Sequence, residues 1–567
     1  MDESQTTRRE NLPHHPAPGA IPRAAIAVVL ALVATACGGS STDDPPATPL
    51  EVACAGEFCG TSSASQYSGT GFGIWRYQNA TSAPVTVNVA IGGVTESMRP
   101  VLLFSNGSAS PTTIPAPLSS PTEALLQPPV LSDADLAREA RDRAHWETGE
   151  RNRRTALALR NLVPTETAGG AMAPPPVSAI GNTYTWLDME EVKKVGDPKV
   201  IRENPSTVRG TCGLSTGRKA AFWVANDAWN VNMTATDLNV FMPIVCGADK
   251  GYDQLKTMIG DAWGDKASTY PNDLIQDAPN LQDIHIVFAN LPSANLAGYF
   301  WGCNNARKGK AASNCPDTNE ALVVFVNARL VKEDQSGQAS TVLHEMTHLV
   351  NYYQRSLVTG SPYDTWLEEM SAMMTEDVVV PMVTSGSIND IPTGRVEPYV
   401  KNAGSVSLMN WDGDKSYNLG ATFGAFLSRR FGTAIYTGMK TCPVGADPNV
   451  GTTYACLNKL IVDNRGESLA DEFARMGASI YGLFPATGAP DRYGFPAKAI
   501  GATYTLGSID VLGYRAGWKA IATPLVDGFL PTTHTYKVDS VPAGSSTYSR
   551  PGVVVPSNTT LMVIIKP

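Results

Sequence analysis

The segment HEMTH at residues 344–348 constrains this 567-residue chain more than any other part of its sequence. Two histidines four positions apart lie one above the other on a helix, so His344 and His348 can turn both imidazoles towards one metal ion. Apolar residues recur beside them at helical spacing, on a line that avoids both histidines: Val342, Met346, Leu349, Val350 and Tyr353. The pattern predicts an amphipathic helix with two metal ligands, and the simpler alternative is a pair of histidines on a solvated helix face.

Glu345 adds a chemical role to this pair of histidines. A catalytic zinc ion needs a third protein ligand and one open position for water. A carboxylate next to a ligand in the chain can take a proton from that water and pass it to a leaving amine. The motif therefore predicts Zn²⁺ as the cofactor and Glu345 as a general base.

The third ligand is sought in the segment WLEEMSA at residues 366–372, which resembles the second ligand-bearing helix of gluzincin metallopeptidases. That resemblance implies Glu369 as the ligand, with the adjacent Glu368 as its rival. The separation from the first motif leaves room for this second helix to fold back against the first. Glu376 shares a helix face with Glu369, and either hydrogen-bonds a ligand histidine or is a plain exposed carboxylate.

A third segment, SYNLGATFGAFLSRRFG at residues 416–432, completes a family pattern. The three segments in this order resemble the hyicolysin-like neutral metallopeptidases, although Ser371 stands one place early and Phe423 replaces a frequent second tyrosine. The resemblance covers residues 180–485 and is strongest over residues 340–432. It implies an α+β zincin-like catalytic domain, with a mixed sheet plus an active-site helix, and a zinc-dependent endopeptidase that acts on protein or peptide substrates.

The resemblance also suggests how a substrate is handled. Gluzincins commonly stabilise the oxyanion with a tyrosine or histidine, which makes Tyr417 the candidate; the alternative is a core tyrosine that anchors a Gly/Ala-rich helix. The strand-like segment DIHIVFA at residues 283–289 is a candidate for binding substrate backbone by strand addition. His285 within it is expected to be a core or edge-strand histidine.

Other chemistries fit the sequence less well. A metzincin needs a histidine where this chain has Gln354 and a glycine where it has Asn351. The segment GLSTG at residues 213–217 matches a serine-hydrolase pattern but lacks the apolar strand that should precede it. Two alternatives stay open: a surface-displayed binding or adhesive lipoprotein with a vestigial zinc-peptidase fold, and a zinc hydrolase of a non-peptide substrate.

The start of the chain is typical of an export signal, with three arginines and an apolar run at residues 24–36. Small residues directly before Cys37 resemble a bacterial lipobox, in which this cysteine would carry a lipid and attach the chain to a membrane of the cell envelope. Cleavage after Ala36, which would leave a secreted protein, is the alternative. The other cysteines form an even set, which in an exported chain predicts disulfides. The simplest pairing is sequential: Cys54–Cys59, Cys212–Cys246, Cys303–Cys315 and Cys442–Cys456.

Composition shifts along the chain predict its domain organisation. The net charge of −9 offers nothing to a phosphate backbone, so nucleic acid is not an expected partner. A charged helix expected at residues 133–162 between Pro-rich stretches is either a solvated helix on a linker or part of a removable pro-segment. The expected parts are a signal peptide (1–36), a lipid-attachment tether (37–60), a β-rich N-terminal region (61–117), a helical, Pro-rich linker or pro-segment (118–178), a zinc metallopeptidase domain (179–485) and a β-rich C-terminal region (486–567).

Overall fold

The structure is a computed structural model, in which all the described residues belong to one compact unit. The expected signal peptide and the proposed lipid attachment at Cys37 lie outside the described residues. The described residues are 47–113, 115, 133–160, 162, 176–189, 201–308, 315, 317–402, 406–411, 413–442, 452–515 and 529–566.

A mixed α/β region is built on a sheet whose six strands run in the order β11-β12-β10-β9-β8-β7. Strand β10 lies between β12 and β9 and pairs with both in parallel. Every residue of β10 and β12 is buried, which explains their uninterrupted apolar sequences, since a strand covered on both faces has no solvated side. The strands are β7 (Thr183–Asp188), β8 (Arg202–Gly213), β9 (Lys219–Ala225), β10 (Ile284–Ala289), β11 (Gly298–Phe300) and β12 (Leu322–Asn327).

This order corrects one expectation about substrate binding. The strand proposed to accept a substrate backbone, at residues 283–289, is β10, and both of its edges are already paired. Among the described strands, the two edges of the sheet are β11, which pairs antiparallel with β12, and β7, which pairs antiparallel with β8. Strand β11 is the edge that contacts α4. His285 is a buried core histidine, as expected, and accepts a hydrogen bond from the indole N–H of Trp223 at 3.0 Å.

Helix α4 (Gln335–Asn351) packs against β11 and β12 and contains the HEMTH segment. Asp334 caps its start by accepting a hydrogen bond from the backbone N–H of Gly337 at 2.8 Å. The other helices are α1 (Asp133–Arg160), α2 (Ala235–Val245), α3 (Gly251–Ile259), α5 (Thr365–Met374), α6 (Val380–Val383), α7 (Glu397–Asn402), α8 (Gly413–Phe431), α9 (Ala434–Met439), α10 (Thr452–Asp463) and α11 (Leu469–Tyr481).

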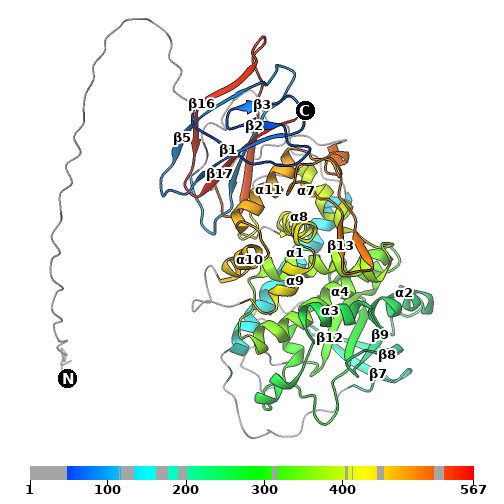
Figure 1. Ribbon diagram of the computed structural model, residues 1–567. Coiled ribbons are helices and arrows are strands. Elements are labelled where there is room, and N and C mark those ends of the chain that lie inside the picture. The colour runs from blue at the N-terminus through cyan, green and yellow to red at the C-terminus, as the bar shows by residue number, and fades with distance from the viewer. Residues whose placement is uncertain are drawn as a thin grey trace, which may run out of the picture. The chain divides into compact units, whose positions relative to one another are not determined.

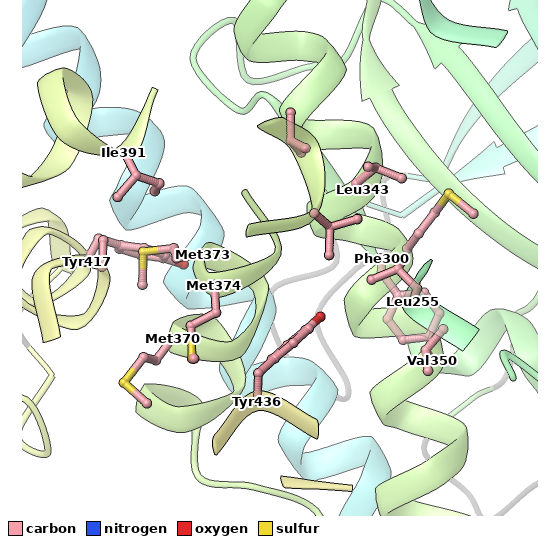
Figure 2. Packing of buried hydrophobic residues seen from close by; sticks show 14 of the residues in the cluster. Leu255, Phe300, Leu343, Val350, Met370, Met373, Met374, Ile391, Tyr417 and Tyr436 are labelled. Carbon is pink, nitrogen blue, oxygen red and sulfur yellow. The ribbon is translucent and has the colours of Figure 1, made fainter. Parts of the chain in front are cut away.

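Helices α5 and α8 approach closely because α8 presents glycines to the methionines of α5. A Cβ atom on Gly424 would lie 2.9 Å from Cγ of Met374, and one on Gly420 would lie 3.1 Å from Cε of Met373. Figure 2 shows these methionines beside Tyr417 of α8. The Gly/Ala-rich sequence of α8 thus lets it pack directly behind the helix that carries Glu369.

The far end of α8 is fixed by a buried ion pair. The Arg429 guanidinium donates to both carboxylate oxygens of Asp377, at 2.7 and 3.2 Å, and the two side chains are 0% and 1% exposed. Asp377 lies in a π-helical turn, Thr375–Val379, that continues α5. The pair therefore holds this turn, and Glu376 within it, against α8.

The two β-rich regions at opposite ends of the chain contribute strands to the same sheets, seen as blue and red strands side by side in Figure 1. One sheet has the order β1-β4-β17-β6-β15 and the other β16-β5-β3-β2. These strands, with the separate hairpin β13–β14, are β1 (Glu51–Val52), β2 (Thr61–Ser63), β3 (Gln66–Tyr67), β4 (Gly73–Asn79), β5 (Val85–Gly92), β6 (Val101–Asn106), β13 (Lys498–Ile500), β14 (Tyr504–Leu506), β15 (Thr533–Val538), β16 (Thr547–Val555) and β17 (Thr559–Ile565).

Strand β17 is buried on both faces because the first sheet is covered on both sides. Leu561, Val563 and Ile565 share a core with the second sheet, whereas Met562 and Ile564 belong to the large core of the α/β region. Ion pairs add to this junction. Arg76 of β4 contacts Glu467 at 3.0 Å and Asp471 at 2.8 Å, near the start of α11.

All four predicted disulfides are confirmed, with the sequential pairing and Cα–Cα distances of 5.3–6.1 Å. Within the described residues, no helix combines the length and the apolar character needed to cross a bilayer.

Candidate metal centre

Three buried side chains from two helices converge on one point. His344 and His348 of α4 direct Nε2 towards Oε2 of Glu369 in α5, at 3.3 and 3.5 Å. A tetrahedral zinc ion with bonds of about 2.0–2.1 Å holds its ligand atoms about 3.3–3.4 Å apart. The two distances match the edges of such a tetrahedron, so the donor set fits a zinc ion.

The outer nitrogens of both histidines are held by carboxylates. Nδ1 of His344 donates to Glu376 at 2.6 Å, and Nδ1 of His348 donates to Glu368 at 2.9 Å. These contacts orient each ring and leave Nε2 free to bind a metal. Glu368, the alternative to Glu369 as a ligand, therefore lies at the outer nitrogen of His348. Glu376 is hydrogen-bonded to a candidate ligand histidine and is not a plain exposed carboxylate.

The unmet hydrogen-bonding capacity of the cluster also fits a cation. Nε2 of His344 and Oε2 of Glu369 are buried and have no hydrogen-bond partner. Burial disfavours a charged imidazole, but the carboxylates outweigh it, raising the pKa of His344 to about 9 and that of His348 well above its usual range. The pKa of Glu369 is held below its usual range by the two histidines, against the effect of burial. Without a cation, protons must supply the positive charge that this cluster requires.

Glu345 points to the side of the cluster that faces β11. Its carboxylate is 1% exposed, and its Oε1 has no hydrogen-bond partner. Burial raises its pKa to about 7, against the lowering effect of the two histidines. Strand β11 passes directly alongside, because Gly298 has no side chain; a Cβ there would lie 3.2 Å from Cγ of Glu345.

Tyr417 of α8 lies in the wall of the same site. Its ring centroid is 4.9 Å from that of Trp411, and the Arg395 guanidinium lies over it at 5.4 Å. Burial and then the Glu369 carboxylate raise the pKa of Tyr417 well above its usual range, so its hydroxyl keeps its proton. The structure thus brings together every site residue named from the sequence.

Comparison with known families decides the identity of the larger part of the chain. Residues 202–566 match the family model described as peptidase M30. The chain belongs to the peptidase M30 family. A second match, over residues 52–118, is to a domain of unknown function, DUF8571, and a search of curated proteins finds no match.

Membership of the peptidase M30 family confirms the resemblance to hyicolysin-like enzymes. It identifies a metallopeptidase family, and hence a peptidase that acts on protein or peptide substrates. The mixed α/β architecture is compatible with such a domain.

One residue at the M30 site was not found from the sequence. His145 of α1 places Nδ1 3.6 Å from Oε1 of Glu345, and its ring centroid lies 5.7 Å from that of His344. Burial and then His344 lower the pKa of His145 to about 3, so its imidazole is neutral. A single histidine in a charged helix has no spacing partner in the sequence, so no local pattern points to it.

Proposed function

We propose that this protein is an exported zinc-dependent endopeptidase of the gluzincin type, with a zincin-like catalytic domain. The observation that carries the proposal is the convergence of two histidine Nε2 atoms and one carboxylate oxygen at tetrahedral spacing. His344, His348 and Glu369 would hold the ion. Once bound, zinc would lower the pKa of a water molecule and polarise the scissile carbonyl.

The chain's own residues supply the remaining steps. Glu345 takes the proton of the attacking water and delivers it to the leaving amine, a task suited to a buried carboxylate next to a metal ligand in the chain. Tyr417 donates its hydroxyl proton in a hydrogen bond to the oxyanion. The edge of β11 beside Glu345 offers backbone donors and acceptors to an extended substrate.

Export and lipid attachment at Cys37 are part of the same proposal. The four disulfides support an oxidising compartment, because such bonds are reduced in the cytosol of most cells. The competing function, an adhesive lipoprotein with a vestigial peptidase fold, is disfavoured by an intact Glu345 next to both histidine ligands.

The test measures bound zinc and casein cleavage for the protein without its signal segment. We expect about one zinc ion per chain, loss of zinc in Glu369→Ala, and zinc without cleavage in Glu345→Gln. The matched control is Glu368→Ala, which should retain zinc with weakened affinity. If Glu368→Ala loses the metal and Glu369→Ala keeps it, the ligand assignment is wrong. Zinc binding without casein cleavage, both in the wild type and in a His145→Ala variant that lacks the imidazole beside Glu345, would favour the adhesive function.

A further inference from the structure

We propose that helix α1 is a built-in plug of this active site, in which His145 takes the position needed by the attacking water and Asn152 takes the backbone edge needed by the substrate. The inference rests on the proposed peptidase function. Neither matched family region includes α1, which lies between residues 118 and 202. In Figure 1, α1 is the cyan helix beside α8, and it contacts α5 as well.

The first observation is the place of the His145 imidazole. A water molecule that loses its proton to a general base must lie within hydrogen-bond reach of that base and beside the metal. His145 stands there: one of its ring nitrogens, a ring nitrogen of His344 and a carboxylate oxygen of Glu345 all lie within 4.8 Å of one another. An imidazole beside both His344 and the general base fills space that the attacking water would need.

The second observation is that α1 lies directly against the third ligand. A Cβ atom on Gly149 would lie 2.8 Å from Oε1 of Glu369 and 3.0 Å from Cγ2 of Thr365. Only a residue without a side chain allows the helix backbone this close to the metal ligand. A peptide substrate therefore has no room between α1 and Glu369.

The third observation concerns the edge of β11. The side-chain amide of Asn152 donates to the carbonyl oxygen of Phe300 at 2.7 Å, and its oxygen accepts from the N–H of Gly302 at 3.0 Å. Phe300 is the last residue of β11, and Gly302 begins the 3₁₀ turn that follows it. An added strand would use the carbonyl oxygen of Phe300 at this edge, and the Asn152 side-chain amide already occupies it in place of a substrate peptide group.

Polar anchors hold the helix in this place. Asp142 pairs with Arg395 at 2.6 Å, and Arg153 pairs with Asp364 at 3.2 Å. The sequence of α1 is rich in charged residues. Among its side chains that the structure describes, Ala156 is buried and Trp146 is partly buried against the core, whereas the other buried ones are polar: Asp142, Thr148, Arg151 and Thr155. A helix held mainly by polar contacts loses little hydrophobic burial on leaving, so it can be displaced without unfolding the domain beneath.

The test compares His145→Ala and Asn152→Ala with Glu147→Ala, an exposed position on the same helix. Cleavage of a quenched peptide is measured with the zinc-loaded protein. Binding of acetohydroxamate, a small ligand for an open metal position, is measured from the visible spectrum of the cobalt-loaded protein. We expect each plug variant to cleave at least ~10-fold faster than wild type and to bind hydroxamate at least ~10-fold more tightly, because both readouts scale with the fraction of open sites. Glu147→Ala should match wild type.

The outcomes separate this inference from the proposed function. A fall in cleavage in His145→Ala with metal retained would make His145 a catalytic residue and overturn the plug. Equal hydroxamate binding in all four proteins would also overturn it. Tighter hydroxamate binding in the plug variants with no cleavage by any of them would support the plug and contradict the peptidase. Failure of every protein to bind metal would contradict both.

Discussion

Replacing Glu376 tests how much the outer carboxylates contribute to the metal centre. Glu376 lies 2.6 Å from Nδ1 of His344 and does not touch the ligand atoms. Its expected effects are to fix the orientation of the ring and to make Nε2 a better electron donor. Both effects reach the metal only through His344, so the loss on substitution should be graded rather than complete.

The structure sets the order of the losses. Glu376→Gln keeps an acceptor for the Nδ1 proton and removes the charge, so zinc affinity should fall by about 10-fold, or about 1.4 kcal/mol. Glu376→Leu removes the acceptor as well, and we expect a loss of about 100-fold, or about 2.7 kcal/mol. Glu368 should matter less, because its contact to His348 is longer, at 2.9 Å, and the same oxygen also accepts from Asn351 at 3.1 Å.

Competition against a chromophoric chelator at constant pH measures these affinities. Glu333→Gln, at an exposed position just before α4, is the matched control for removal of one negative charge. Zinc affinity in Glu376→Leu within twofold of wild type would refute the reasoning. A loss in Glu333→Gln as large as that in Glu376→Gln would also refute it, since general electrostatic attraction would then explain the result.

Three further predictions concern stability and are measured by urea unfolding. Arg429→Met leaves the buried charge of Asp377 unpaired and should lower the free energy of unfolding by about 3–5 kcal/mol. Gly424→Val forces a side chain against Met374 and should cost about 1–3 kcal/mol. Glu467→Gln should cost about 1–2 kcal/mol at pH 7, after allowance for the screening of a side chain that is one-third exposed.

The last of these effects should depend on pH. Against the effect of burial, two neighbouring arginines hold the pKa of Glu467 at about 2, below its ordinary 4.5. Its contribution is therefore present above pH 4.5 and shrinks as the pH falls towards 2. A difference between wild type and Glu467→Gln that grows on acidification would contradict this assignment. The control for Arg429→Met, which breaks the buried Arg429–Asp377 pair, is the exposed Lys459–Asp463 pair. Lys459→Met should change the free energy of unfolding by less than ~0.5 kcal/mol.

The parts of the site that lie on one helix face could be predicted from the sequence. The i, i+4 spacing of His344 and His348 fixes their relation within α4, and the apolar residues beside them show which side is packed. Adjacent carboxylates on a helix point about 100° apart. One of Glu368 and Glu369 therefore had to face away from the point where the ligands meet, although the sequence alone could not show which.

Contacts between distant segments could not be predicted in this way. His145 reaches Glu345 across two hundred residues of chain, and nothing in its own helix marks it as different from a surface histidine. The apolar sequence of DIHIVFA predicts a buried strand but not its neighbours, and the edge position of β11 depends on how β12 pairs. Register and order in a sheet are properties of the partners, which a local pattern does not contain.

The shared sheets mean that backbone continuity is not what keeps the two ends of this protein together. Strand β17 lies between β4 and β6 and pairs with both, as Ile74 with Ile564 and Val101 with Ile564. A single backbone cut between β6 and β7 would leave these ladders and their two cores intact. The product would be a two-chain particle that migrates as one species under native conditions and separates into two only after denaturation.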